Sequence, residues 1–259
     1  MHELRFITKE EPELYRCTAH SRQRVSLAAR HDEYGPAFDI SKIVGSMSAQ
    51  FPIKKADILL EKDTALTDED KSLFAYFGVN AKILPPFRIL NPQNIVIGDY
   101  TAIREGCHIN AFADLSFLIN YIDVRYRGDF DAADYVYESR IEIGRENQIG
   151  RFAFMSCTSS IVLENNVLIS ERVYIGDNNH SFSHPDVPIM QQPNGRGRPI
   201  AIGAGSWIGA GAAVLPGTRV GRNCVIGANS VCRGGEYPSH SVIGPESAKI
   251  LYRRFEKND

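Results

Sequence analysis

Large aliphatic residues recur at every sixth position along the last third of the chain. From Ile202 the sequence divides into the units IGAGSW, IGAGAA, VLPGTR, VGRNCV and IGANSV. An aliphatic residue stands first in each unit, a small residue stands fifth, and glycine usually stands second. The same phase occurs upstream in IGDYTA, IREGCH, IGRENQ, IGRFAF, LENNVL and ISERVY. The chain is therefore built mainly from one repeated unit of six residues.

A period of six differs from the 3.6-residue period of a helix and predicts short strands separated by corners. The aliphatic and small residues would point inward, and glycine, Asn or Asp would turn each corner where φ is positive. Three units then complete one turn of a triangular coil, and each coil buries its inner face only against its neighbours. This geometry predicts that Ile202 stacks on Val220, Ile208 on Ile226, and Val214 on Cys232.

The repeated unit resembles that of the hexapeptide-repeat acyltransferases, and most of all their xenobiotic, maltose and polysaccharide O-acetyltransferase branch. The resemblance covers roughly residues 86–251 and is most specific over 163–251. It implies a mainly β chain folded as a left-handed parallel β-helix. It also implies an enzyme that transfers an acetyl group from acetyl-CoA to a carbohydrate hydroxyl. The family usually assembles as a homotrimer with each active site between two prisms, so we expect a homotrimer.

The pattern divides the chain into three predicted parts. Residues 1–85 lack the repeat and are expected to form a smaller, mostly helical or α+β segment. Within it, TALTDEDKSLFAYFG has the Thr/Asp start and closing glycine of a short helix. Residues 86–243 form the β-helix, and residues 244–259 form a C-terminal tail.

Two segments interrupt the repeat, at residues 120–140 and 181–199. The first carries four tyrosines. It is either a surface excursion that caps the coil, or one wall of an acceptor pocket lined by tyrosine rings. The second is rich in proline and glycine, which is typical of a semi-rigid loop that carries function on a regular scaffold.

The second interruption begins in the stretch IGDNNHSFSH. Continuing the phase from Ile175 places Asn179 at an inward position and His180 at an outward one. Transfer of an acyl group from a thioester to a hydroxyl needs a general base that works near neutral pH, and histidine suits this role. In the resembled branch, a catalytic histidine stands where the helix opens into a loop, in a D-x-N-H-like setting. The resemblance therefore places the base at His180, within the letters DNNH.

Other residues around this break are candidates for the site. His184 is a rival base. Asp177 could hydrogen-bond the imidazole and fix its tautomer, or it could be only a corner residue. Asn179 could orient a neighbouring backbone segment or the acceptor. Trp207, the only tryptophan, occupies an outward position, where it either packs against the 181–199 loop or another subunit, or lines the cleft between donor and acceptor. Asn179, His184 and Trp207 are thus candidate substrate-binding residues.

The donor site is predicted from the resemblance alone. In the family a groove along the last coils binds coenzyme A through backbone groups, and cations suit its phosphates. This assigns donor binding to Ala210, Ala228, Cys232, Arg233 and Lys249. The family commonly has Thr-Lys where this chain has Cys232 and Arg233, so one hydroxyl is lost while the positive charge is kept.

Composition narrows the class of partner. Lys and Arg number 29 against 31 for Asp and Glu, for a net charge of −2, which argues against a nucleic-acid or anionic-membrane partner. No apolar run reaches the ~18 residues of a membrane span. The start, MHELRFITKEEPELYR, lacks the apolar region of a signal peptide. Five widely spaced cysteines without a CxxC pair argue against a disulfide framework and against a zinc site. We expect a cytoplasmic protein without a metal.

Three alternative functions remain open. N-acetylation of an amino sugar is the nearest, because its amine also needs deprotonation. A zinc carbonic anhydrase of the β-helical kind would need three histidines shared across a trimer interface, and the repeats offer only His108 and His180 in phase, with His184 in the loop. A non-catalytic scaffold or binding module is the third.

Overall fold

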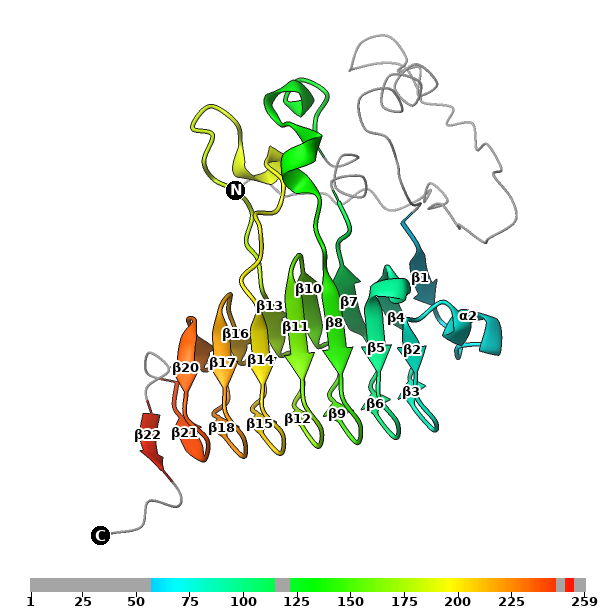
Figure 1. Ribbon diagram of the computed structural model, residues 1–259, viewed down its shortest axis with the longest axis vertical. Coiled ribbons are helices and arrows are strands. Elements are labelled where there is room, and N and C mark those ends of the chain that lie inside the picture. Colours follow the sequence, from blue (N-terminus) through cyan, green and yellow to red (C-terminus); the bar gives the residue numbers. More distant parts are fainter. Residues whose placement is uncertain (1–56, 115–121, 246–249, 254–259) are drawn as a thin grey trace, which may run out of the picture. The chain divides into compact units, whose positions relative to one another are not determined.

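Three sheets form the sides of a three-sided prism (Figure 1). The structure is a computed structural model that describes residues 57–114, 122–245 and 250–253. From β1 to β21, successive strands along the chain belong to different sheets, so three consecutive strands complete one coil. The coil winds in the left-handed sense, opposite to the usual crossover between parallel strands. The predicted fold class is confirmed.

The strands are short and lie in register from coil to coil. Sheet A consists, in order, of β1 (Leu59–Lys62), β4 (Phe87–Leu90), β7 (Cys107–Ala111), β10 (Phe154–Cys157), β13 (Tyr174–Gly176), β16 (Ala213–Val214) and β19 (Val231–Cys232). Sheet B consists of β2 (Tyr76–Phe77), β5 (Ile95–Ile97), β8 (Arg140–Ile143), β11 (Ser160–Leu163), β14 (Ile200–Ile202), β17 (Thr218–Val220) and β20 (Gly235–Tyr237). Sheet C consists of β3 (Lys82–Ile83), β6 (Ala102–Ile103), β9 (Gln148–Ile149), β12 (Leu168–Ile169), β15 (Trp207–Ile208), β18 (Val225–Ile226), β21 (Ser241–Ile243) and β22 (Ile250–Arg253).

Helical elements lie outside the sheets. They are α2 (Asp68–Ser72) and the 3₁₀ turns η1 (Pro92–Asn94), η3 (Arg127–Asp129), η4 (Ala132–Tyr135) and η5 (Ile189–Gln191). Pairing is parallel except at two places, where β1 pairs antiparallel with β4 and β22 pairs antiparallel with β21. An antiparallel strand therefore covers one edge of sheet A and one edge of sheet C, which would otherwise expose unpaired backbone groups.

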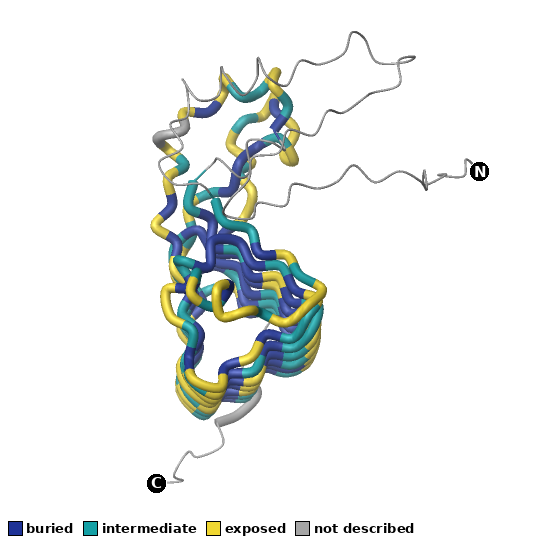
Figure 2. The backbone as a smooth tube through the Cα atoms, turned by 90° about the vertical axis from the view of Figure 1, so that its right-hand side faces the viewer, coloured by how far each residue is buried: buried dark blue, intermediate teal, exposed yellow. Residues whose placement is uncertain are grey.

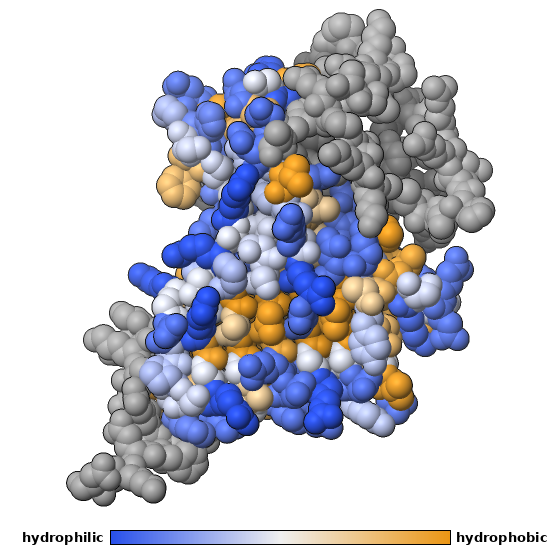
Figure 3. Space-filling view, viewed as in Figure 1, coloured by the Kyte–Doolittle hydropathy of each residue, from blue (hydrophilic) through white to orange (hydrophobic). Residues whose placement is uncertain are grey.

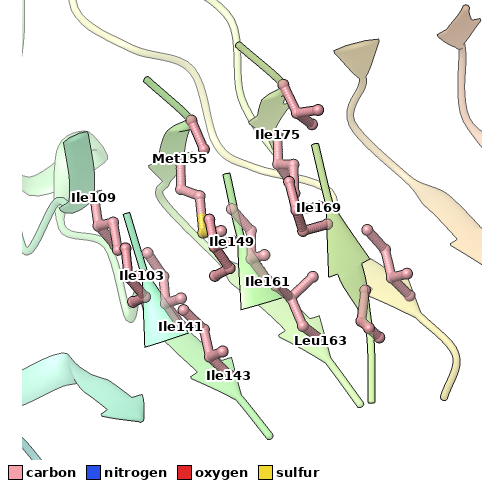
Figure 4. Packing of buried hydrophobic residues seen from close by; sticks show 14 of the residues in the cluster. Ile103, Ile109, Ile141, Ile143, Ile149, Met155, Ile161, Leu163, Ile169 and Ile175 are labelled. Atoms are coloured by element: carbon pink, nitrogen blue, oxygen red, sulfur yellow. The ribbon is translucent and has the colours of Figure 1, made fainter. Parts of the chain in front are cut away.

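The core is a stack of aliphatic side chains inside the prism (Figure 4). Figure 2 marks the buried positions along the backbone of the coils. All three predicted contacts between coils are confirmed by the register, which pairs Ile202 with Val220, Ile208 with Ile226, and Val214 with Cys232. The small residue at the fifth position is also buried. Where it carries a hydroxyl, that group is satisfied: Thr218 Oγ1 donates to the Leu215 carbonyl at 2.7 Å. A polar atom can therefore lie in this apolar interior without an unpaired hydrogen-bonding group.

The second-position glycines serve a purpose other than the predicted one. Gly203 has no positive φ; instead, a Cβ atom there would lie 2.6 Å from the Gly221 backbone of the next coil. These glycines let adjacent coils approach closely. The corners with positive φ fall at later positions of the unit, such as Gly205 and Asn223.

The β-helix begins earlier than the predicted boundary at residue 86. Strands β2 and β3 already belong to the parallel sheets, so the first coil starts at Tyr76. The short helix predicted in TALTDEDKSLFAYFG is confirmed as α2. Thr67 caps it, because the Thr67 hydroxyl accepts from the Asp70 amide while the Asp70 carboxylate accepts from the Thr67 amide. The helical prediction for residues before 57 lies outside the described residues.

Candidate active site

Two long connections leave the prism along one edge, where the strands of sheet A end and those of sheet B begin. We call this the A–B edge. Loop L1 (residues 122–139) leads into β8, and loop L2 (residues 177–199) joins β13 to β14. Figures 1 and 2 show both loops rising from the same side of the coil. One intact coil lies between them, and its corner on this edge is formed by Thr158 and Ser159, between β10 and β11.

L1 packs against L2. The Tyr137 hydroxyl donates to the Asn194 carbonyl, and the Phe130 ring lies edge-on to the His184 ring with centroids 5.2 Å apart. Tyr137 is only 5% exposed, and burial raises the pKa of its hydroxyl. Its hydroxyl therefore binds L2, while its ring packs in an apolar cluster with Leu90 and Phe112 and does not offer a flat face to a sugar. The structure favours L1 as an excursion over L1 as a pocket wall; Tyr121 lies outside the described residues.

Asp177 anchors the start of L2. It is fully buried, and its two carboxylate oxygens accept from the backbone amides of Thr158 at 2.9 Å and Ser159 at 2.8 Å. The Cys157 thiol and the Asn178 side-chain amide also donate to this carboxylate, at 3.3 and 3.0 Å. Asp177 thus binds the corner of the preceding coil. The prediction that it hydrogen-bonds the imidazole of His180 is wrong, because its oxygens face these donors.

His180 is exposed, as predicted, and its ring is held by another part of L2. Its Nδ1 atom lies 3.2 Å from the Gln192 carbonyl oxygen. A carbonyl can only accept, so Nδ1 carries the hydrogen and Nε2 of the neutral ring keeps its lone pair. His180 and Asn194 form an antiparallel bridge beside this contact. Its two backbone hydrogen bonds run from Ser181 N to Pro193 O and from Gly195 N to Asn179 O, both at 2.8 Å. The ring is therefore oriented with one nitrogen available as a base.

The sequence did not indicate Gln192, which organises the middle of L2. Its side chain is buried; Nε2 donates to the His184 and Val187 carbonyls, and Oε1 accepts from the His184 amide. His184 therefore contributes to the structure of L2, because its ring packs against Phe130 and its backbone is hydrogen-bonded to the Gln192 side chain. The sequence carries no signal for this role, because Gln192 stands beside a second glutamine, Gln191, in a segment of mixed polar and apolar residues.

A hollow of about 320 Å³ opens beside His180. Residues 177–183 line one side of it, and Gly195, Arg196 and Arg198 line the other. Pro216, from the next coil, completes the lining. Asn179 is exposed in this hollow, so its predicted inward position is wrong although its predicted place near the acceptor stays a hypothesis.

Trp207 is not brought beside His180 within one chain. It lies in β15 of sheet C, the side of the prism away from the A–B edge, and is 47% exposed. Its indole nitrogen donates to the Ser170 hydroxyl at 2.9 Å. The outward position is confirmed. Within one subunit, Trp207 therefore neither packs against L2 nor lines the hollow beside His180. Its contact with another subunit stays a prediction.

The predicted donor-binding residues are distributed over two edges. Ala210 and Ala228 are exposed and adjacent at the edge between sheets C and A, where the Asn229 amide donates to the Ala210 carbonyl at 2.9 Å. Arg233 is exposed on the A–B edge, directly after β19. The side chain of Cys232 is fully buried in the core, so it cannot contact coenzyme A, and only its backbone remains available. Lys249 lies outside the described residues.

The chemistry of the described residues gives no support to a thiol nucleophile or to a metal. Burial raises the pKa of the Cys232 thiol to about 12 and that of the Cys107 thiol to about 11. These thiols therefore stay protonated and unreactive. No group of three His, Cys, Asp or Glu side chains with the spacing of a metal site occurs among the residues that the structure describes.

Comparisons with known proteins agree with this architecture. Residues 199–234 match the family described as bacterial transferase hexapeptide (six repeats). Among solved structures, AntD, an N-acyltransferase from Bacillus cereus in complex with dTDP and 3-hydroxybutyryl-CoA, has a TM-score of 0.56 at 17% identity. That match covers 75% of this chain and 92% of AntD, and it establishes a shared fold.

Two curated relatives are similar in sequence. A probable acetyltransferase of Mycobacterium tuberculosis is 28% identical over 65% of this chain, and the match spans only 54% of that relative. The putative lipopolysaccharide biosynthesis O-acetyl transferase WbbJ of Escherichia coli K12 is 36% identical over 58% of this chain and 76% of its own length. From the stacked coils, the matched repeats and this last relative together, the chain belongs to the hexapeptide-repeat acyltransferase family.

Proposed function

We propose that the protein transfers an acetyl group from acetyl-CoA to a hydroxyl of a carbohydrate, with His180 as general base. The observation that carries this proposal is the orientation of the His180 ring. Nδ1 faces the Gln192 carbonyl, which leaves Nε2 as the proton acceptor at the border of an open hollow. A histidine oriented by a carbonyl on one nitrogen and free on the other is suited to general base catalysis.

The reaction needs no covalent enzyme intermediate. His180 Nε2 takes the proton from the acceptor hydroxyl, and the hydroxyl oxygen attacks the carbonyl carbon of the thioester. The carbon–sulfur bond then breaks, the acetyl group becomes an ester of the carbohydrate, and the imidazolium returns its proton to the departing thiolate of coenzyme A. The buried, protonated thiols described above fit this direct route, because none of them could serve as an acyl carrier.

Two relatives favour oxygen as the accepting atom. WbbJ is named as a putative lipopolysaccharide biosynthesis O-acetyl transferase. A galactoside O-acetyltransferase of Lactococcus lactis is 29% identical over 34% of this chain and 44% of its own length. AntD is an N-acyltransferase, but at 17% identity its likeness concerns the fold alone.

The stability of the product to alkali tests the choice of O over N. The wild-type chain would be incubated with radiolabelled acetyl-CoA and matched pairs of neutral and amino sugars, such as galactosides and galactosaminides. We expect release of free coenzyme A with the hydroxyl acceptors, and label that mild alkali removes, because an ester hydrolyses far more readily than an amide. Label that resists alkali and appears only with the amino sugars would contradict O-acetylation and favour N-acetylation.

We further propose that the active form is a homotrimer in the cytoplasm. Apolar side chains form a band across the face of sheet B (Figure 3), where the outward residues Val96, Val162 and Ala201 are only partly buried. The same outward row also carries Glu142, between Val96 and Val162, and Arg219, next to Ala201. Trp207 and Leu168 are 47% and 44% exposed on sheet C. Such faces are typical of subunit contacts. The four cysteines within the described part of the chain are buried and free, which fits a reducing compartment. No helix among the described residues is long and apolar enough to cross a membrane.

Sedimentation equilibrium of the full chain tests the assembly. One chain has a mass of 28.9 kDa, and we expect a single species with three times that mass. If the interface uses the outward row of sheet C, Trp207→Glu should shift the equilibrium toward the single chain, because a charge would be buried against apolar partners. A wild-type protein that sediments as one chain at all concentrations would contradict the trimer.

A further inference from the structure

Two arginines of L2 bring positive charge to the hollow beside His180, and general base catalysis does not use them. Arg196 and Arg198 both line the hollow that His180 lines, and both are exposed. Neither guanidinium forms an ion pair with a carboxylate among the residues that the structure describes. Among the described residues that line the hollow, Asp177 alone is acidic, and its oxygens accept from the amides of the preceding corner.

The charge of Arg198 is fixed in place by the next coil. Its Nη2 atom donates to the Pro216 carbonyl at 2.9 Å, and its guanidinium lies over Gly217, where a Cβ atom would be 3.4 Å from its central carbon. The backbone is fixed as well, because the Arg198 amide donates to the Asp177 carbonyl at 2.8 Å. One carbonyl satisfies only part of the guanidinium, which carries five N–H donors. The remaining donors are available to a ligand.

Arg196 lies on the other side of Gly197, which packs directly on Asp177. A Cβ atom at Gly197 would lie 2.7 Å from the Asp177 carboxyl carbon, so only glycine lets the chain pass so close to this buried anchor. The anchor therefore sets the position of the backbone between the two arginines. The charge of Arg196 also acts on the nearby Tyr137 hydroxyl, whose pKa is raised by burial above all.

We propose that Arg196 and Arg198 bind an anionic group of the acceptor, so that the enzyme acts on acidic carbohydrates carrying a carboxylate or a phosphate. The inference rests on the proposed function. A guanidinium binds either anion through paired N–H donors. The phosphates of coenzyme A do not fit here, because the pantetheine arm separates them from the thioester, which must reach His180 in this same hollow. An anion on the acceptor is close to its reacting hydroxyl and fits the space.

Equilibrium binding in the absence of acetyl-CoA tests this without any turnover. Calorimetric titration of the full wild-type chain would use trigalacturonate against its methyl ester, and glucose 1-phosphate against methyl glucoside. We expect one anionic probe to bind at least about tenfold more tightly than its neutral counterpart, because hydrogen bonds to charged groups contribute strongly. Which pair shows the difference identifies carboxylate or phosphate. Equal binding within a pair for both pairs, or no binding of either anion at millimolar concentration, would overturn the proposal.

Arg196→Gln is the informative variant, because it removes the charge without the structural contact that Arg198 makes. We expect it to weaken binding of the preferred anion at least about tenfold and leave the neutral probe unchanged. Arg222→Gln is the matched control, since Arg222 is exposed at the corner between sheets B and C. In the transfer assay, KM for the anionic acceptor should rise while KM for acetyl-CoA stays constant. A rise in KM for acetyl-CoA alone would assign the arginines to the donor and overturn the inference.

The failure of this inference can be told apart from failure of the proposed function. Anion-selective binding that depends on Arg196, in a protein that transfers no acetyl group, would keep the site and reject the reaction. Acetyl transfer that depends on His180 but does not depend on the charge of the acceptor would support the reaction and reject the anion site.

Discussion

Replacing His180 by alanine is expected to lower kcat/KM for acetyl transfer at least about 10²-fold, because positioned proton transfer contributes roughly 10²- to 10⁴-fold to catalysis. The substitution removes the imidazole that lines the hollow. In this ring, Nδ1 is held by the Gln192 carbonyl, and Nε2 is left unprotonated as the proposed proton acceptor. Free coenzyme A, measured with a thiol reagent in the presence of acetyl-CoA and a competent acceptor, reports the rate. Because the ring is exposed, the melting temperature should change little.

Two controls separate loss of a base from loss of structure. Added imidazole should restore part of the rate to the alanine variant, since a small base can enter the space that the ring leaves. His108→Ala provides a matched histidine substitution: His108 is exposed on the outer face of sheet A, where its ring lies 6.0 Å from that of Phe154. That variant should keep the wild-type rate. A His180→Ala protein within a few-fold of wild type would rule out His180 as the base.

The second large effect is expected on stability. Asp177→Ala should lower the free energy of unfolding by about 3–5 kcal/mol, because it leaves buried donors without an acceptor. These donors are the backbone amides of Thr158 and Ser159, the Cys157 thiol and the Asn178 amide. Urea denaturation measures the global effect. Hydrogen exchange at the Thr158 and Ser159 amides measures the local one, and both amides should exchange faster.

Asp177→Asn refines this test, because a neutral amide offers one oxygen where the carboxylate offers two. One of the two corner amides should then stay protected while the other loses its partner, and the stability loss should be smaller than for alanine. Asp186→Ala is the matched control, since Asp186 is an exposed residue of the same loop. An Asp177→Ala protein with unchanged stability and unchanged exchange at the corner would show that the carboxylate does not anchor L2.

The repeat predicted the coil correctly because each position of the unit has one physical requirement. The first and fifth positions must fill a narrow interior, and that requirement fixes the register, so the pairing of Ile208 with Ile226 could be derived by counting. The interruptions of the count likewise located both loops. The second-position glycine was misinterpreted, since a close approach between coils and a positive φ both favour glycine and the sequence alone does not separate them.

The details of the site could not be derived in the same way. β13 ends at Gly176, so the six-residue phase counted from Ile175 no longer applies at Asn179. Asp177 and Asn178 are buried instead of Asn179. The partners of Asp177 lie in the preceding coil, and those of His180 lie across an irregular loop. Neither pairing follows a period, and each depends on how the chain folds back on itself.

The donor residues show a related limit. Motif order along the chain suggested one groove containing Ala210, Ala228 and Arg233. Successive units point to successive sides of a triangle, however, so residues one unit apart lie on different edges, and only residues three units apart share one. Ala210 and Ala228 meet this condition, and Arg233 does not. Counting units in threes, in addition to matching motifs, would have predicted this separation.

The roots of L1 and L2 on one edge have a consequence for how such a protein can diversify. Each loop departs from and returns to strands that the stack already holds in adjacent positions, so lengthening it adds only a small closure entropy and leaves the register of the coils intact. New recognition segments can therefore be inserted along this edge while the His180 imidazole, the proposed base, keeps its place. Grafting such segments between homologous coils is a direct route to enzymes with altered acceptor range.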